Sequence, residues 1–278
     1  MAVKPPFQAQ VPNSLFCNTP QEMMRPEEIR DRFTEKSEWF DRHYDSARGR
    51  VRLRVLQEQL RRELPAPPAR ILDAGCGPGR MAAALTADGH RLTLLDPNEA
   101  MLERAKAAIA PHAGGSRVLC GTVEEAPEIF GQETFDVVLL HAVVCYVQDL
   151  DAALGAAAAV LKPGGVLSIL FKNHAALPFK HAADGRFEEA LRVLDDPLDT
   201  GKLGITNQAR SRQEVEEASA RRGLRPRKAY GVRAFADLVP EEISGADLER
   251  LVSLELNACE REPYRSVSRM LHLVCEHD

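Results

Sequence analysis

The chain lacks the cysteine spacing of a disulfide framework or a metal site. Its six cysteines are scattered, no two form a Cys-x-x-Cys pair, and most lie inside apolar runs, where a small buried thiol is the usual interpretation. We therefore expect no metal. The cysteines are Cys17, Cys76, Cys120, Cys145, Cys259 and Cys275.

Long hydrophobic runs and internal repeats are also absent. The longest apolar run, Ala152 to Leu161, is too short to span a bilayer, and Met1 to Pro12 has no basic segment followed by an apolar core. We therefore expect a cytoplasmic protein with no membrane partner. With 278 residues and 44% hydrophobic content, the chain can bury a sizeable core.

The chain has no overall excess of positive charge. Its formal net charge of −5 argues against a nonspecific nucleic-acid binder. Two stretches depart from this balance: residues 42–70 hold eight Lys or Arg against three Asp or Glu, and residues 201–233 hold nine against three. These two basic islands are either landing sites for a polyanion or ordinary solvated helix faces, and the sequence leaves both interpretations open.

A glycine-rich turn after a strand-like run is the most informative feature of the chain. Ile71-Leu72-Asp73-Ala74 leads into Gly75-Cys76-Gly77-Pro78-Gly79, and Asp96 ends the next apolar run. Glycines let the backbone approach a ligand closely, and an acid at the end of the next strand can accept both hydroxyls of a ribose. The pattern predicts a nucleoside pocket.

The spacing of the glycines distinguishes between nucleosides. A dinucleotide loop has Gly-x-Gly-x-x-Gly, whereas here the third glycine, Gly79, comes one residue early. Asp73, just before the loop, would repel a phosphate but can hold the ammonium group of an amino-acid tail. These features favour S-adenosylmethionine as the cofactor.

Strand and helix patterns alternate after residue 70, which predicts an α/β fold with a parallel sheet covered on both faces. Two helices, from residue 26 and over 50–64, should lie above the cofactor end, and the stretch from 179 to 204 has no clear period. We divide the chain into an extended or mobile arm (1–25), an N-terminal helical cap (26–66) and a main domain (67–278) with an insertion at about 178–210. The expected strands are 70–74, 91–96, 116–120, 135–141, 165–171, 224–232 and 267–275, and the other expected helices are one from about 79, then 98–110, 149–161, 211–222 and 246–261.

These motifs resemble those of the class I S-adenosylmethionine-dependent methyltransferases. Asp73 to Gly79 is similar to the first motif of that family, Asp96 to its ribose acid, and Leu161 to Gly165 to its late strand-entry motif. The resemblance implies a Rossmann-like, mostly parallel sheet with an antiparallel last strand from Val267 to Cys275. Our candidate cofactor-binding residues are Arg52, Asp73, Gly75, Cys76, Gly77, Gly79, Asp96, Pro97, Met101, Val123, Glu124 and His141.

Segments outside these motifs resemble the tRNA 5-carboxymethoxyuridine methyltransferases, which esterify a carboxylate on a wobble uridine. By this resemblance Arg52 would hold the methionine carboxylate of the cofactor and tRNA would be the partner. The sequence leaves open a small carboxylic acid, phenol or amine as the acceptor, and also a noncatalytic nucleoside-binding module. The segments are 48–52, 135–143, 171–174, 231–235 and 259–264.

The candidate catalytic residues depend on the acceptor. A carboxylate, with a reference pKa of about 4, is already ionised and needs only cations to orient it, for which Arg233 and Lys172 are candidates. A phenol would need a base, for which His141 or His174 would serve. Tyr146 either lines the acceptor site or packs in the core. The sequence says nothing about oligomeric state.

Overall fold

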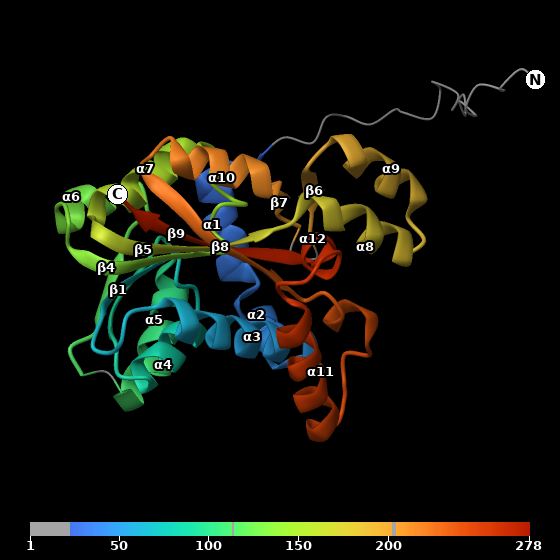
Figure 1. The fold of residues 1–278 in the computed structure, drawn as a ribbon, viewed down its shortest axis with the longest axis horizontal. Helices are drawn as coiled ribbons and strands as arrows, with labels where there is room; N and C mark the ends of the chain where they lie inside the picture. The colour runs from blue at the N-terminus through green and yellow to red at the C-terminus, as the bar shows by residue number, and fades with distance from the viewer. Residues whose placement is uncertain (1–22, 113, 202–203) are drawn as a thin grey trace, which may run out of the picture.

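A seven-stranded sheet with the order β3-β2-β1-β4-β5-β9-β8 forms the centre of the molecule (Figure 1). The computed structural model describes residues 23–112, 114–201 and 204–278, so nearly all of the proposed arm at 1–25 lies outside the described residues. The strands are β1 (Arg70–Ala74), β2 (Arg91–Asp96), β3 (Arg117–Cys120), β4 (Phe135–His141), β5 (Leu161–Lys172), β8 (Leu224–Val232) and β9 (Met270–His277).

Strands β1 to β5 are parallel to one another, and β9 runs antiparallel between β5 and β8. The predicted Rossmann-like sheet and its antiparallel last strand are therefore confirmed. The last strand begins at Met270 and not at Val267, because Tyr264–Val267 form a short helix, α12. Strand β5 begins at Leu161, earlier than expected, with a register shift against β4 before Val166.

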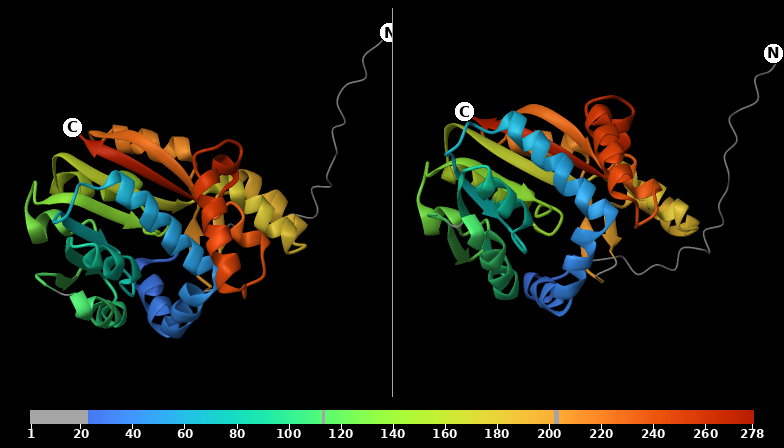
Figure 2. Two further views of the ribbon diagram at one scale, coloured as in Figure 1. Left: turned by 60° about the horizontal axis from the view of Figure 1, so that its bottom comes forward. Right: turned by 90° about the horizontal axis from the view of Figure 1, so that it is seen from below.

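Helices cover both faces of this sheet (Figures 1 and 2). Alternate side chains of each strand enter opposite cores: Ile71 and Leu139 join one cluster of buried residues, and Leu72 and Val138 join the other. One face carries α3 (Ala47–Glu63), α4 (Arg80–Ala87), α5 (Glu99–Ile109) and α11 (Gly245–Ala258); the other carries α6 (Ala126–Phe130), α7 (Leu150–Val160) and α10 (Arg212–Ala220).

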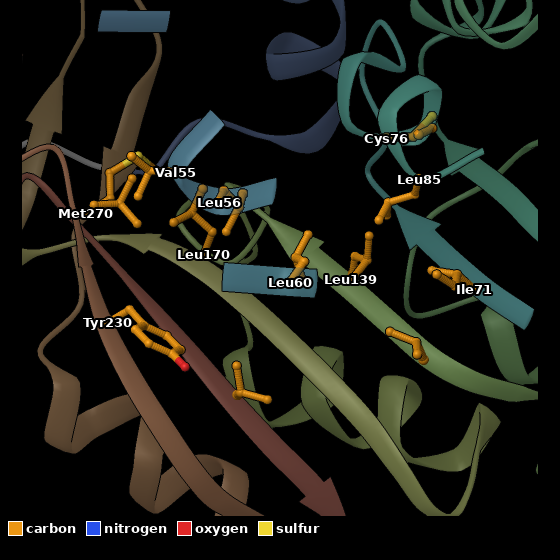
Figure 3. Packing of buried hydrophobic residues seen from close by; sticks show 14 of the residues in the cluster. Val55, Leu56, Leu60, Ile71, Cys76, Leu85, Leu139, Leu170, Tyr230 and Met270 are labelled. Atoms are coloured by element: carbon orange, nitrogen blue, oxygen red, sulfur yellow. The ribbon is translucent and has the colours of Figure 1, made fainter. Parts of the chain in front are cut away.

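Helix α3 packs directly on the middle of the sheet. Figure 3 shows Val55, Leu56 and Leu60 of α3 in the same cluster as Leu139 of β4 and Leu170 of β5. In the parts of the chain that the structure describes, no helix has the length and apolarity to cross a membrane, and no three His, Cys, Asp or Glu side chains cluster as metal ligands would.

The N-terminal segment forms two helices where we expected one. Helix α1 (Pro26–Glu35) and α2 (Ser37–Asp45) are separated at Lys36, whose ψ of 18° departs from helical geometry. The side chain of Asn98, at the end of β2, holds α1 in place: its Nδ2 donates to the Arg30 carbonyl at 2.9 Å and to Thr34 Oγ1 at 2.9 Å. Helix α1 therefore lies over the carboxyl ends of the strands, as predicted, whereas α3, the second helix expected there, packs on one face of the sheet.

The segment without a clear period contains regular structure. It folds as α8 (Leu177–Ala183), α9 (Phe187–Asp195) and a hairpin of β6 (Leu198–Thr200) and β7 (Thr206–Gln208). These elements are shorter than the windows in which periodicity becomes visible, which is why the sequence did not reveal them. The hairpin is tied to the sheet edge by the Gln208 amide, which donates to the Cys145 carbonyl at 2.9 Å.

Candidate active site

A large cavity lies at the carboxyl ends of the parallel strands, beneath α1 and α2. Its volume of about 1450 Å³ exceeds the several hundred Å³ that one small ligand occupies. Strand β1 lies between β2 and β4, so the chain turns in opposite directions on its two sides, and ligands of open α/β sheets bind at such a switch point. The cavity therefore has room for a cofactor and an acceptor together.

The glycine loop forms one wall of this cavity, and its three glycines differ in what they do. All three have positive φ. A Cβ on Gly77 would meet no protein atom within 4 Å, so this backbone faces open cavity, whereas a Cβ on Gly75 would lie 2.3 Å from Val143 Cγ2. A Cβ on Gly79 would lie 2.8 Å from the Cα of Ala105 on α5, and Gly79 does not line the cavity. Its role is to pack helices.

Asp96 holds the glycine loop and faces the same cavity. Its Oδ2 accepts from the Gly77 amide at 2.8 Å and its Oδ1 from the Asn98 amide at 2.9 Å. Burial raises the pKa of Asp96, and these two amides oppose that rise. Each oxygen keeps a further lone pair, so the carboxylate can still accept the two hydroxyls of a ribose.

Asp73 is buried at the end of β1 and also lines the cavity. Burial, together with the nearby Asp96 carboxylate, raises the pKa of Asp73 to about 7. A buried carboxylate is stabilised by a cation. The bare glycine backbone and these two acids fit the adenosyl and ammonium groups of S-adenosylmethionine.

This arrangement predicts that cofactor binding releases a proton. At pH 7 the Asp73 carboxyl of the free protein is about half protonated, and a bound ammonium group would lower its pKa and ionise it, releasing roughly half a proton per cofactor. Calorimetry in buffers of different ionisation enthalpy measures this number. Asp73→Asn should abolish the release, and a wild-type protein that binds cofactor with no proton released would contradict the assignment.

His141 and Arg52 lie at the same end of the cavity. The imidazole of His141 is bonded through Nε2 to Ser168 Oγ at 2.8 Å, and its buried Nδ1 has no hydrogen-bond partner among the described residues. Burial lowers the pKa of His141 well below its usual value, and His272 and Arg52 lower it further. The imidazole is therefore neutral at pH 7.

The other candidate cofactor residues also line the cavity. Cys76 and Met101 are buried, and burial raises the pKa of the Cys76 thiol, so it stays protonated. Val123 is buried and Glu124 is exposed after β3, where the adenine ring would lie if the ribose binds Asp96. The members of this group that line the cavity are Cys76, Pro97, Met101, Val123 and Glu124.

A second group of polar residues also lines the cavity, and we call the part that they line the acceptor end. Lys172 ends β5, and its Nζ donates to Asn207 Oδ1 at 2.5 Å and lies 6.0 Å from the ring centre of Tyr146. Tyr146 packs edge-on against Phe33 of α1, with ring centres 5.3 Å apart. Tyr146 therefore lines the cavity and also forms part of its roof.

Sequence reasoning missed three members of this group: Lys180, Asp199 and Arg269. The buried Asp199 accepts from Lys180 Nζ at 3.2 Å and lies 4.0 Å from Arg269 Nη2. Arg269 Nη1 is buried with no partner among the described residues. Because β9 is antiparallel, the residue before it must lie at the carboxyl edge of the sheet, which was the available signal for Arg269.

Arg233 lies beside Arg269, whose amide donates to the Arg233 carbonyl at 3.1 Å. Its guanidinium lines the cavity and is paired with Asp237, with Nε to Oδ2 at 3.0 Å. Arg233 has a φ of 64°, a strained value for a residue with a side chain. Glu255 of α11 holds this turn by accepting the amides of the three following residues at 2.8–2.9 Å.

His174 is not part of the cavity. Its Nε2 is bonded to the Val193 carbonyl at 2.8 Å, and it is absent from the residues that line the site. The hypothesis that His174 serves as a base is therefore wrong, because the imidazole instead joins the sheet edge to α9.

The basic islands carry less free charge than their composition suggests. In the first, Arg54 and Arg61 pair with Glu249 and Asp88, each at 2.8 Å. In the second, most arginines pair with acids from distant parts of the chain, such as Arg221 with Asp151 at 2.8 Å, and few residues of this island line the cavity.

Comparison with known proteins identifies the family of this chain. Residues 72–169 match the family described as "Methyltransferase domain". The chain is 30% identical over 259 residues to the tRNA 5-carboxymethoxyuridine methyltransferase of Escherichia coli K12, covering 87% of this chain and 94% of that protein. It is 37% identical over 125 residues to a ubiquinone biosynthesis O-methyltransferase of a Bradyrhizobium species, covering 45% of this chain and 48% of that one.

Solved structures share the fold. A methyltransferase from Thermotoga maritima superposes with a TM-score of 0.61 at 18% identity, covering 90% of this chain and all of that one. A Burkholderia thailandensis N-methyltransferase with bound S-adenosylhomocysteine gives 0.59 at 19% identity, with 94% of each chain covered. The chain belongs to the S-adenosylmethionine-dependent methyltransferases. S-adenosylmethionine is its cofactor.

Proposed function

We propose that this methyltransferase acts on a carboxylate oxygen, and that its substrate is the carboxymethoxy group of a tRNA wobble uridine. The observation that carries the proposal is the charge at the acceptor end of the cavity. Four cations, Lys172, Lys180, Arg233 and Arg269, outnumber the three acids that lie among them, Asp184, Asp199 and Asp237. Their surplus positive charge makes this end complementary to an anionic group.

The residues present suit an acceptor that needs no base. A carboxylate is already ionised at pH 7, so its oxygen loses no proton when it takes the methyl group that the sulfonium cofactor supplies. The protein has to bind and orient the acceptor, and orientation alone can contribute several kcal/mol. Lys172, Arg233 and Arg269 would do so, and the neutral His141 would not act as a base toward a carboxylate.

The tRNA part of the proposal is supported by the relative named above, which matches nearly the full length of this chain. Arg42 and Arg48 from the first basic island line the cavity, where they would meet phosphates. A cytoplasmic location, which we expect from the sequence, suits such a substrate. A small carboxylic acid is the second candidate, since an apolar roof of Ile29, Phe33 and Ile205 covers part of the cavity.

Methyl-labelled cofactor tests the two substrates. The protein and the labelled cofactor would be incubated with bulk tRNA from cells that do not make this protein, or with a small-metabolite extract from the same cells. We expect label in tRNA that is released by mild alkali, as an ester is, and a rate that falls steeply with added salt because phosphate contacts release counterions. Alkali-labile label confined to the small-molecule fraction would support the second candidate, and alkali-stable label would reject a carboxylate acceptor.

The charge of Lys172 should limit activity at high pH. Burial lowers the pKa of Lys172 to about 8, so this ammonium group is charged below pH 8 and becomes neutral above it. We expect kcat/KM for the acceptor to fall about tenfold per pH unit above pH 8. Lys172→Gln should have a low kcat/KM that no longer falls there, and a wild-type profile that stays flat to pH 10 would remove Lys172 from the acceptor site.

A further inference from the structure

A chain of buried side chains connects His141 to helix α3. Ser168 Oγ lies 2.8 Å from His141 Nε2 and 2.8 Å from His272 Nε2. His272 Nδ1 lies 2.8 Å from Gln59 Oε1, and Gln59 Nε2 donates to the Gly231 carbonyl at 3.2 Å. Ser168, His272 and Gln59 are all fully buried and do not line the cavity, so contact with a ligand does not explain them.

The Gly231 carbonyl, at the end of this series of hydrogen bonds, fixes which atom donates in each of them. The Gly231 carbonyl can only accept, so Gln59 presents its NH₂ to that carbonyl and its oxygen to His272. His272 therefore carries its proton on Nδ1. Burial lowers the pKa of His272 to about 3, so the ring is neutral and its Nε2 must accept from the Ser168 hydroxyl.

The same reasoning shows which nitrogen of His141 carries the proton. Because Ser168 has one proton and gives it to His272, its oxygen accepts from His141 Nε2–H. A neutral imidazole has only one N–H, so Nδ1 of His141 is an unprotonated acceptor. This is the buried atom that has no partner among the described residues.

The sheet register places His141 on the strand next to that of Asp73 and on the same face of the sheet. Asp73 of β1 pairs with Leu139 of β4, and His141 is two residues further along β4, so all three side chains point to the same face. Arg52, on the helix that covers this face, also lines the cavity and lowers the pKa of His141. An ammonium group has three donors, of which Asp73 and His141 Nδ1 would take two.

We propose that Gln59, His272 and Ser168 are positioning residues that hold His141 in the tautomer with its proton on Nε2, so that Nδ1 accepts a hydrogen bond from the cofactor's ammonium group. The opposite tautomer would point an N–H at that cation and weaken binding. This inference concerns the cofactor site, so it is independent of which acceptor the enzyme methylates.

A thermodynamic cycle that combines loss of the Ser168 hydroxyl with loss of the ligand's α-amino group tests the proposal. Binding of S-adenosylhomocysteine and of its analogue without the α-amino group would be measured by calorimetry in the wild type and in Ser168→Ala. We expect Ser168→Ala to weaken S-adenosylhomocysteine about tenfold and the deaminated analogue less than twofold. A folded variant that loses the same factor for both ligands would overturn the proposal, because a general structural defect cannot distinguish them.

Nitrogen NMR of the histidines decides the question even if Ser168→Ala does not fold. In the wild type we expect His141 to be protonated on Nε2 and His272 on Nδ1, which are opposite tautomers. A proton on His141 Nδ1 would refute the proposed hydrogen-bond directions. Ser219→Ala is the matched control, since it removes another buried serine hydroxyl on the other side of the sheet and should leave both affinities and the His141 tautomer unchanged.

Discussion

Replacing Gly77 with asparagine should weaken cofactor binding about a hundredfold, which is about 2.7 kcal/mol. A Cβ at this position would meet no protein atom within 4 Å, so the side chain would extend into the part of the cavity where we expect the cofactor to lie. Asparagine tolerates the φ of 52° at Gly77 better than other residues, so the fold should survive. Calorimetry with S-adenosylhomocysteine and the thermal midpoint of unfolding measure the two effects separately.

Gly164→Asn is the matched control for this substitution. Gly164 has a φ of 72° and open space around it, as Gly77 has, but it lies in the first part of β5 and does not line the cavity. Both variants place a non-glycine residue at a positive φ, so both should lose a similar amount of stability. Only Gly77→Asn should also lose affinity for the cofactor. Full affinity in folded Gly77→Asn would show that the loop does not contact the cofactor.

The residues that we assign to the cofactor could be predicted to lie together because their signals are local. Gly75, Gly77 and Asp73 lie within one strand and one turn, and Asp96 ends the next strand, so chain order alone places them at one edge of the sheet. The role of Gly79 required coordinates. Only the lack of space beside it, where a Cβ would lie 2.8 Å from the Cα of Ala105, distinguishes a glycine that packs helices from one that faces a ligand.

The acceptor half was not predictable to the same extent, because distant segments build it. Lys180 and Asp199 belong to α8 and β6, two short elements without a visible period, and they meet Arg269 only through the tertiary fold. Composition also could not decide between the two interpretations of the basic islands. Composition counts charges but not pairs, and the acids that neutralise Arg54 and Arg221 lie 195 and 70 residues away.

Arg269→Ala should lower kcat/KM for the acceptor about a hundredfold and change the affinity for S-adenosylhomocysteine less than twofold. A charge-assisted hydrogen bond to a carboxylate contributes about 1.5–3 kcal/mol. Arg269 lines the cavity with its Nη1 unpartnered among the described residues, so we expect it to supply such a bond. Removing Arg269 leaves Asp199 paired with Lys180 at 3.2 Å, so no buried charge loses its last partner. Initial rates over a range of acceptor concentrations measure the loss.

Arg265→Ala is the comparison that separates acceptor binding from general loss of charge. Arg265 is four residues away on α12, pairs with Glu262 at 2.6 Å and lies outside the cavity, so its removal should change kcat/KM less than twofold. Arg269→Lys keeps the charge but loses the planar fork of donors, and it should recover part of the activity. Equal activity in Arg269→Ala and Arg265→Ala would show that another residue recognises the acceptor's negative charge. Lys172, which is bonded to Asn207, and Arg233, which is paired with Asp237, would then be the candidates.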